Sequence, residues 1–147
     1  MIELLVVEDN DGDVVLFEKA FEQIKAGKKL QFVADGEEAL NFLFRKKGYE
    51  EAHRPDLVLL DLNLPKVNGR EVLKVIKSDP ELKAIPVIVF TSSLAEKDIF
   101  DCYDLHANSY VIKPMDYYEF LETIRKLAGF WFEAVKFPAR RQEEMRE

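Results

Sequence analysis

Cysteine and histidine are scarce in this sequence of 147 residues, which contains one cysteine and two histidines. A single cysteine, Cys102, excludes an internal disulfide framework, and the shortage of cysteine and histidine ligands argues against structural zinc. Small proteins of oxidising compartments usually depend on such cross-links. We therefore expect the protein to work in a reducing cytoplasm.

Long apolar runs are missing as well. No stretch approaches the ~20 consecutive apolar residues that a membrane-spanning helix needs. The first residues, Met1-Ile2-Glu3, open a strand-like segment and do not resemble a signal peptide. The sequence therefore predicts a soluble protein with no membrane partner.

Excess positive charge is the third feature that the sequence lacks. The formal net charge is -7, and no basic stripe offsets it. Proteins that bind the phosphate backbone of nucleic acids generally present clustered lysine and arginine. We therefore expect no nucleic-acid partner.

What the sequence does contain is a regular alternation of short apolar runs with amphipathic segments. This alternation predicts an α/β fold in which helices cover both faces of a parallel sheet. With 48% hydrophobic residues, the chain fits one compact domain, which we place at 1–128, followed by a helical extension and charged tail at 129–147. The expected strands are 2–7, 30–33, 57–61, 86–91 and 109–112, and the expected helices are 13–25, 37–47, 69–78, 96–105 and 117–132.

Some boundaries and positions within the sheet can also be predicted. Capping-box spacing marks three helix starts, at Asp35 with Glu38, Ser93 with Glu96, and Asp116 with Glu119. The run 57–60 is continuously apolar, so it should be a central strand, whereas 30–33 has the mixed character of an edge strand. The charged stretch 46–55 is long for a connection and is expected to form a mobile surface loop of unassigned role.

Polar residues stand where four of the strands should end. Glu8 and Asp9 follow the first strand, Asp61 the third, Thr91 the fourth and Lys113 the fifth. Each has an ordinary structural explanation when taken alone, such as helix capping for the acidic pair or a solvated charge for the lysine. The carboxyl ends of parallel strands share one sheet edge, however, where ligands bind. The combination therefore predicts one site for a magnesium ion and a phosphoryl group.

Four short motifs surround these polar residues, namely Val7-Glu8-Asp9, the run from Asp61 to Gly69, Phe90-Thr91-Ser92 and the run from Tyr110 to Pro114. Together they resemble the receiver domain of the two-component response regulators. This resemblance covers about residues 2–128 and implies a flavodoxin-like, doubly wound sheet of five parallel strands in the order 2-1-3-4-5 with five helices. The extended C-terminus and the Asp11-Gly12-Asp13 segment are similar to the phytochrome-associated response regulators.

The resemblance implies a role for each acidic residue. Asp61 corresponds to the phosphoacceptor, which takes a phosphoryl group from a phosphohistidine of a sensor histidine kinase. Asp9 and Asp61 would bind Mg²⁺ directly, Glu8 would act through water, and the backbone carbonyl of Asn63 would complete the protein ligands. A hard divalent cation also relieves the repulsion among the three carboxylates.

The remaining site residues have implied roles in transfer and switching. Lys113 would pair first with Asp61 and then with a phosphoryl oxygen. Thr91 would bind the phosphoryl group and move inward, and the ring of Tyr110 would enter the vacated space. Without the other residues, Tyr110 would be interpreted as a half-buried strand aromatic. The resemblance also makes a cis Lys113-Pro114 peptide plausible, although Pro114 could equally be a first-turn helix proline.

Three functions are compatible with such a site. The first is a stand-alone signalling switch that catalyses only its own phosphorylation and dephosphorylation and is not a conventional turnover enzyme. The second is a phosphatase of the haloacid-dehalogenase type, but its nucleophile follows the first strand and a second aspartate lies two residues later, where this chain has Asn63. The third is a scaffold that no longer accepts phosphate. Stable self-labelling by acetyl phosphate would distinguish the first from the other two.

The C-terminal aromatic residues suggest self-association. The last helix carries more apolar side chains than docking on a sheet requires, so we expect a homodimer through 96–105, 109–112 and the last helix. The alternative is that these aromatic side chains fold back into the core. The side chains in question are Tyr117, Phe120, Phe130 and Phe132.

Overall fold

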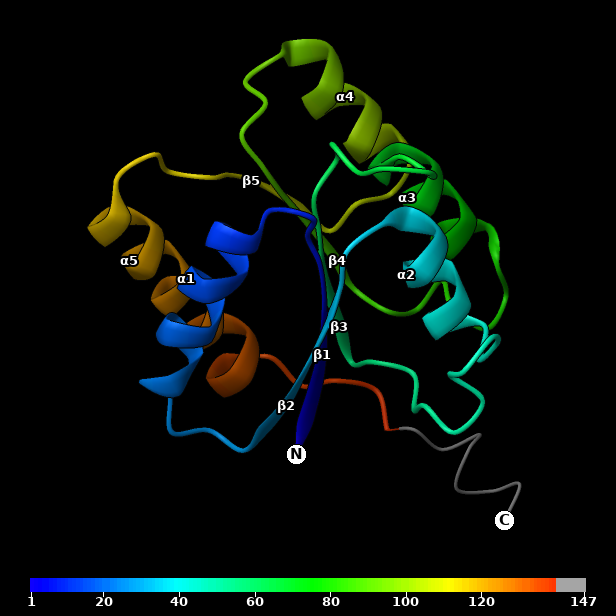
Figure 1. The fold of residues 1–147 in the computed structure, drawn as a ribbon, viewed down its shortest axis with the longest axis horizontal. Helices are drawn as coiled ribbons and strands as arrows, with labels where there is room; N and C mark the ends of the chain where they lie inside the picture. The colour runs from blue at the N-terminus through cyan, green and yellow to red at the C-terminus, as the bar shows by residue number, and fades with distance from the viewer. Residues whose placement is uncertain (140–147) are drawn as a thin grey trace.

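The computed structural model describes residues 1–139 and contains one parallel sheet of five strands in the order β2-β1-β3-β4-β5 (Figure 1). The strand order and the parallel pairing confirm the predicted flavodoxin-like fold. The strands are β1 (Ile2–Val7), β2 (Lys28–Val33), β3 (Leu57–Leu60), β4 (Val87–Thr91) and β5 (Ser109–Ile112).

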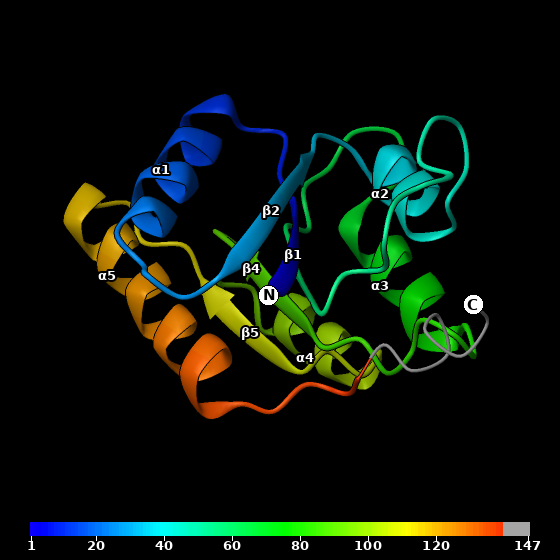
Figure 2. The same cartoon turned by 90° about the horizontal axis from the view of Figure 1, so that it is seen from below.

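Helices cover both faces of the sheet. Figures 1 and 2 show α1 and α5 on one side and α2, α3 and α4 on the other. No helix within residues 1–139 is long and apolar enough to cross a membrane. The helices are α1 (Asp11–Glu22), α2 (Gly36–Leu43), α3 (Gly69–Ser78), α4 (Glu96–Asp104) and α5 (Tyr117–Ala128).

The core consists of two apolar layers, because successive strand side chains point to opposite faces of the sheet. In β3, Val58 and Leu60 pack toward α2 and α3, while Leu57 and Leu59 pack toward α1 and α5. All four residues of β3 are buried. This confirms that β3 is a central strand, and β2 lies at one edge of the sheet as expected.

Strand β5 forms the other edge of the sheet. An edge strand presents backbone groups that have no partner strand. Here the hydroxyl of Tyr103 on α4 accepts a hydrogen bond of 3.1 Å from the backbone N–H of Tyr110. The α4 helix therefore covers part of the exposed edge of β5.

Two of the three predicted capping boxes have the expected N-cap. Asp35 accepts a hydrogen bond from the backbone N–H of Glu38, and Asp116 accepts one from that of Glu119. The prediction for Ser93 is wrong, because α4 begins two residues later with Ala95 as its N-cap. The Ser93 hydroxyl instead lies 2.5 Å from the Asp98 carboxylate. A contact with the first turn of α4 has replaced the predicted cap.

The chain leaves α5 differently from what the sequence predicted. Helix α5 ends at Ala128 and continues as a wider π-helical turn, η1 (Gly129–Ala134), where we expected regular helix to 132. Phe120 is buried between Phe17 and Phe90 and belongs to the core, whereas Phe132 is half-buried and stacks on Phe21 at the margin of the core.

Tyr117 and Phe130 remain exposed, as expected. Of the predicted charged tail at 139–147, the part from 140 onward lies outside the described residues. The division of the chain into 1–128 and 129–147 stays a prediction.

Two glycines bring connecting segments close to the site. A Cβ on Gly69 would lie 2.2 Å from the carbonyl oxygen of Asp61, and a Cβ on Gly36 would lie 1.8 Å from that of Val67. Real Cβ atoms do not approach backbone that closely, so only glycine fits at either position. The starts of α2 and α3 can therefore pack tightly around the segment that follows Asp61.

The 46–55 segment is fixed to the body of the domain by one aromatic residue. The ring of Tyr49 packs edge-on against Phe42, with 5.1 Å between centroids. Its hydroxyl donates a hydrogen bond of 2.6 Å to Glu38, and this carboxylate and burial together raise the pKa of Tyr49 to about 12. This segment is thus anchored at its centre.

Candidate functional site

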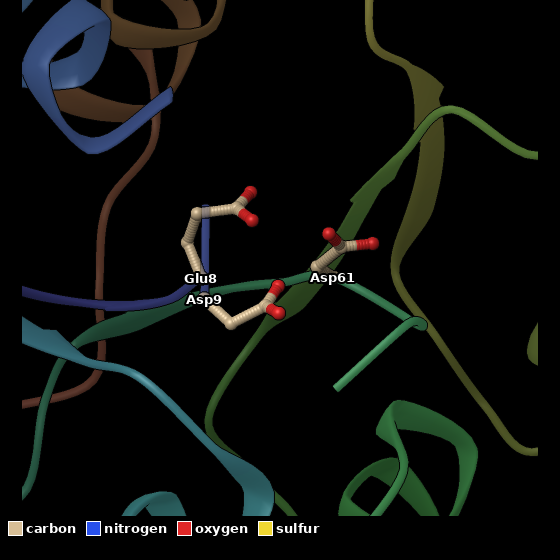
Figure 3. A group of neighbouring side chains, drawn as sticks. All are labelled: Glu8, Asp9 and Asp61. Carbon is tan, nitrogen blue, oxygen red and sulfur yellow. The ribbon is translucent and has the colours of Figure 1, made fainter. Parts of the chain in front are cut away.

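Three carboxylates meet at the carboxyl edge of the sheet. Glu8 and Asp9 follow β1, and Asp61 follows β3, which pairs with β1 in parallel. One oxygen from each lies within 4.8 Å of the others, and Figure 3 shows the three side chains converging. Glu8 and Asp61 are buried, whereas Asp9 is exposed. Carboxylate oxygens in this arrangement are suitable ligands for a hard divalent cation.

The only buried cation at this edge among the described residues is Lys113, which directly follows β5. Its backbone N–H donates to the carbonyl of Thr91 at 2.8 Å, which fixes the start of the side chain. Its Nζ lies 2.5 Å from Glu8, 2.9 Å from Asp61 and 2.9 Å from Asp13. An ammonium group has three N–H donors, so these three carboxylates can accept all of them.

Burial and neighbouring charges shift the pKa values of Glu8 and Lys113 in opposite directions. Burial raises the pKa of Glu8 to about 7, although Lys113 partly opposes this effect. Burial alone would lower the pKa of Lys113, but hydrogen bonds to Glu8, Asp61 and Asp13 outweigh it, and the pKa lies above its ordinary value. Lys113 therefore stays protonated, and its positive charge is permanently available to the site.

Thr91 and Tyr110 lie beside this cluster on β4 and β5. Thr91 is fully buried, and its Oγ1 has no hydrogen-bond partner within the described part of the chain. Buried hydroxyls normally have a partner, so this one is available to a ligand or to another conformation. Tyr110 packs against the core, and its hydroxyl donates to the carbonyl of Ser93 at 2.9 Å.

An open cleft of about 480 Å³ gives access to the site from solvent. The exposed Asn63, whose backbone N–H lies 3.3 Å from Asp61, is part of its wall. The predicted acidic residues, Asn63 and Lys113 thus share one cleft. Its lining comprises Glu8, Asp9, Asn10, Asp13, Leu16, Asp61, Asn63, Ser92, Lys113, Pro114, Met115, Asp116 and Phe120.

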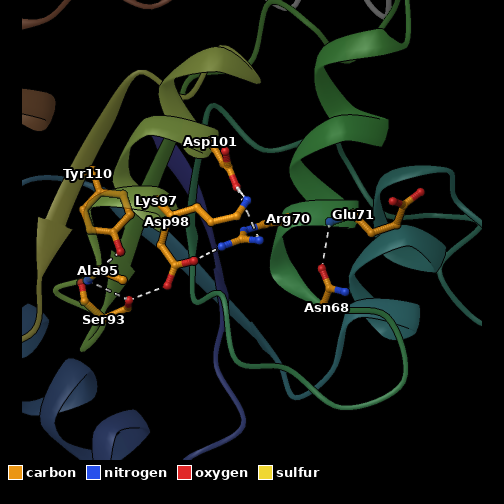
Figure 4. A network of polar contacts seen from close by, with 9 residues as sticks. All are labelled: Asn68, Arg70, Glu71, Ser93, Ala95, Lys97, Asp98, Asp101 and Tyr110. Atoms are coloured by element: carbon orange, nitrogen blue, oxygen red, sulfur yellow. Dashed lines mark hydrogen bonds and ion pairs between the residues drawn. The ribbon is translucent and has the colours of Figure 1, made fainter.

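A polar network connects the loop after β4 with the helices on the far side (Figure 4). Arg70, near the start of α3, forms ion pairs with Asp98 and Asp101 of α4. Asp98 also contacts the hydroxyl of Ser93, whose carbonyl accepts the hydrogen bond from Tyr110. The loop that follows Thr91 is therefore tied to both α3 and α4.

The backbone conformation before and after β5 bears on two features of the sequence. Every peptide bond within residues 1–139 is trans, so the cis Lys113-Pro114 peptide that the resemblance suggested is not present. His106 is exposed and has a φ of 71°, in the left-handed region where glycine is the least strained residue.

Sequence reasoning missed two residues that contact the site or its surroundings. Asp13 was noted only as part of a subgroup motif, and Arg70 was not singled out. The place of Asp13 in the first turn of α1, at the ligand-binding edge of the sheet, was a usable signal. No local pattern indicates that Arg70 reaches α4, because that contact depends on how two helices pack.

The fold and the acidic edge together are typical of a domain that can hold a divalent cation beside a carboxylate able to accept a phosphoryl group. The sequence profile of the response regulator receiver domain matches residues 4–125. The chain belongs to this family, whose members act as signalling switches and not as conventional enzymes.

Individual relatives extend the similarity to nearly the whole chain. Response regulator Rcp1 of Synechocystis sp. is 40% identical over 136 residues, which are 92% of each chain. The crystal structure of its Mn²⁺-bound form superposes with a TM-score of 0.92 and covers 95% of this chain and 100% of Rcp1. The phosphorylated cyanobacterial phytochrome response regulator RcpA is 42% identical, with a TM-score of 0.91, and covers 94% of this chain and 99% of RcpA.

The bacteriophytochrome response regulator RtBRR is also similar. It is 38% identical, with a TM-score of 0.74, and the match covers 99% of this chain and 89% of RtBRR. The phytochrome-associated relatives that the sequence motifs suggested are therefore among its structural neighbours.

The raised pKa of Glu8 predicts how the stability of the metal-free protein depends on pH. Between the ordinary value of 4.5 and the folded value of about 7, the folded state binds a proton that the unfolded state has released. The contribution of Glu8 to stability is fully present below pH 4.5 and is lost as the pH rises through 7. The free energy of unfolding should therefore decrease on the order of 2 kcal/mol over this interval.

The Glu8→Gln variant provides the control, because it lacks this titration. Urea unfolding of both proteins in EDTA at several pH values should show the parent losing stability relative to the variant as the pH rises. A constant difference across the interval would contradict the assigned pKa of Glu8.

Proposed function

We propose that this protein is a response regulator that accepts a phosphoryl group on Asp61 from a sensor histidine kinase in a Mg²⁺-dependent reaction. The observation that carries this proposal is the position of Asp61. Its carboxylate lies within 4.8 Å of the acidic pair and 2.9 Å from the Lys113 ammonium, in a cleft open to solvent. The receiver family to which the chain belongs supports the same reaction.

The proposed step is a transfer between two side chains. A carboxylate oxygen of Asp61 attacks the phosphorus of a phosphohistidine, so an O–P bond forms as the N–P bond breaks, and the leaving imidazole nitrogen takes up a proton. The product on this chain is an acyl phosphate. Lys113 stays charged, so its ammonium can pair with the Asp61 carboxylate before the transfer and with a phosphoryl oxygen after it.

The donor set of the site fits Mg²⁺. Glu8, Asp9 and Asp61 supply oxygen ligands only, and the backbone carbonyl of Asn63 is the remaining proposed protein ligand. Bound there, the cation would neutralise the carboxylates and the phosphoryl oxygens. The Mn²⁺-bound form of Rcp1 supports a divalent site in this family, and we assign Mg²⁺ from the hard oxygen ligands.

Two other functions are less well supported. A haloacid-dehalogenase-type phosphatase would need an acid two residues after the nucleophile, and residue 63 is an asparagine that lies exposed in the cleft. A scaffold without phosphorylation would not require Lys113 to be buried among three carboxylates. The phosphoryl switch explains both observations.

Substitution of the proposed acceptor tests this function directly. Asp61→Asn should abolish labelling by acetyl phosphate, because an amide oxygen is a poor nucleophile, while Tm changes little. Asp104→Asn, at the exposed end of α4, is the matched control and should label like the parent. Intact-mass measurement of one added phosphoryl group provides the readout, and equal labelling of the Asp61 variant would refute the assignment.

We further propose that Thr91 and Tyr110 convert phosphorylation into a change at the surface. The unpartnered Thr91 hydroxyl supports this, since an acyl phosphate would bring new acceptor oxygens close to a buried donor. A shift of Thr91 would act on the following loop, to which Tyr110 is bonded through Ser93. The ion pairs of Arg70 with α4 oppose that shift, so we expect a partial pre-equilibrium between two states.

The switch can be tested with beryllium fluoride as a phosphoryl analogue. In the parent and in Thr91→Ser, which keeps the hydroxyl, the analogue with Mg²⁺ should shift the backbone amide NMR signals of Ser93 and Tyr110. In Thr91→Ala the analogue should still bind, but these shifts should largely disappear because the hydroxyl contact is missing. Full shifts in Thr91→Ala would refute this coupling.

The upstream partner that we propose is a phytochrome-like sensor histidine kinase. RcpA is described as a cyanobacterial phytochrome response regulator, and RtBRR as a bacteriophytochrome response regulator. The similarity of this chain to both supports a kinase of the same class. A phosphorylated kinase domain of that class should transfer its label to the parent protein and not to Asp61→Asn.

We also propose a homodimer through α4, β5 and α5. Exposed apolar side chains on α4 and β5 support it, namely Phe100, Tyr103 and Ile112, which are 68%, 48% and 40% exposed. Several large apolar side chains exposed on two neighbouring elements are typical of an interface. A symmetric dimer would bury the same face of both copies.

The dimer is best tested by surface substitutions. Removal of the chain from Gly129 onward would also uncover Phe21, which stacks on Phe132, so truncation would confuse folding with association. Phe100→Ser should reduce the dimer fraction at tens of micromolar because it removes the largest apolar contact of α4. Light scattering after size exclusion gives the mass, and Val15→Ser on α1, also exposed, is the control. A strictly monomeric parent would contradict the proposal.

A further inference from the structure

Among the described residues, Asp13 is the one carboxylate that contacts Lys113 without belonging to the group that can hold a metal. Its Oδ2 lies 2.9 Å from Nζ, the same distance as the Oδ2 of Asp61. The metal group consists of Glu8, Asp9 and Asp61. Asp13 therefore contacts the lysine of the site but is not one of the proposed metal ligands.

The position of Asp13 is fixed by the start of α1. Its backbone N–H donates to the side chain of the N-cap residue Asn10 at 2.9 Å. Asp13 thus lies in the first helical turn, and its side chain lines the cleft that gives access to Asp61. The contact with Lys113 joins α1 to the end of β5 across 100 residues of sequence.

A cation and a phosphoryl group would change the partners of Lys113 unequally. Glu8 and Asp61 would share their charge with the cation, and Asp61 would lose its free carboxylate on phosphorylation. Asp13 takes part in neither event, so its attraction for the ammonium persists. The phosphoryl group and Asp13 then attract the same ammonium toward different places, Asp13 toward α1 and the phosphoryl oxygens toward Asp61.

We propose that Asp13 is a positioning residue that competes with the phosphoryl group for the Lys113 ammonium. This inference rests on the proposed function of Asp61 and Lys113. Asp13 holds the lysine on the α1 side of the cleft, which weakens the lysine's bond to the phosphoryl group. The lifetime of the acyl phosphate is therefore set partly by a residue that touches neither the metal nor the phosphorus.

Asp13→Asn tests the competition, because it keeps the shape of the side chain and removes its charge. Since a charge-assisted hydrogen bond is about twice as strong as a neutral one, the Kd of beryllium fluoride in Mg²⁺ should fall about fivefold. The half-life of the acyl phosphate should also lengthen, because Lys113 would bind the phosphoryl group more tightly. Asp11→Asn is the matched control, since Asp11 is exposed, lies in the same first turn and has no contact with Lys113.

A double-mutant cycle shows whether Asp13 acts through Lys113. In a Lys113→Met background, Asp13→Asn should leave the Kd of beryllium fluoride unchanged, because there is no longer an ammonium to compete for. A change of equal size in that background, or in Asp11→Asn, would mean a general charge effect and would overturn the proposal. Unchanged or weaker binding by Asp13→Asn itself would also overturn it.

These outcomes are separate from a failure of the proposed function. If the parent protein neither binds beryllium fluoride nor accepts phosphate from acetyl phosphate, then the assignment of Asp61 is wrong. If the parent does both and Asp13→Asn binds the analogue like the parent, then only the role of Asp13 is wrong.

Discussion

The balance of charge around the Lys113 ammonium is the interaction on which the rest of the site depends. Glu8, Asp13 and Asp61 surround a lysine whose side chain is 10% exposed. Two buried carboxylates beside a half-buried third would repel one another strongly without a cation. The lysine stabilises this arrangement in the metal-free protein, and it can do so because the parallel strands β1, β3 and β5 all end at the same edge.

The same lysine also connects the site to the opposite side of the sheet. Its backbone N–H is bonded to Thr91, and the fixed spacing along β5 places Tyr110 three residues earlier, where its hydroxyl reaches Ser93. From Ser93 the polar contacts continue to Asp98 and Arg70 (Figure 4). A change of charge at Asp61 can therefore influence α4 through a continuous set of physical contacts.

The failures of sequence reasoning share a physical cause. Ser93 has good capping spacing, but its hydroxyl bonds to Asp98 because the loop is held against α3 and α4. Phe120 and Phe132 extend beyond one helical stripe, yet Phe120 is in the core and Phe132 packs against it, because α1 presents Phe17 and Phe21 opposite them. In each case a contact with a segment distant in sequence, namely Arg70 for the loop and α1 for the aromatic side chains, competes with a local preference.

By itself the sequence predicted five strands, the central position of β3 and the sheet edge at which the polar residues meet, because hydrophobic periodicity and strand ends are local features whose consequences in a parallel sheet are fixed. The strand order was implied by the resemblance to receiver domains. Only the tertiary structure decided that Asp13 reaches Lys113, that Arg70 reaches Asp98, and that the Thr91 hydroxyl has no hydrogen-bond partner within residues 1–139. Those contacts depend on the packing of separate helices and loops against the sheet. Which side chains touch across two packed elements cannot be predicted from the sequence of either element alone.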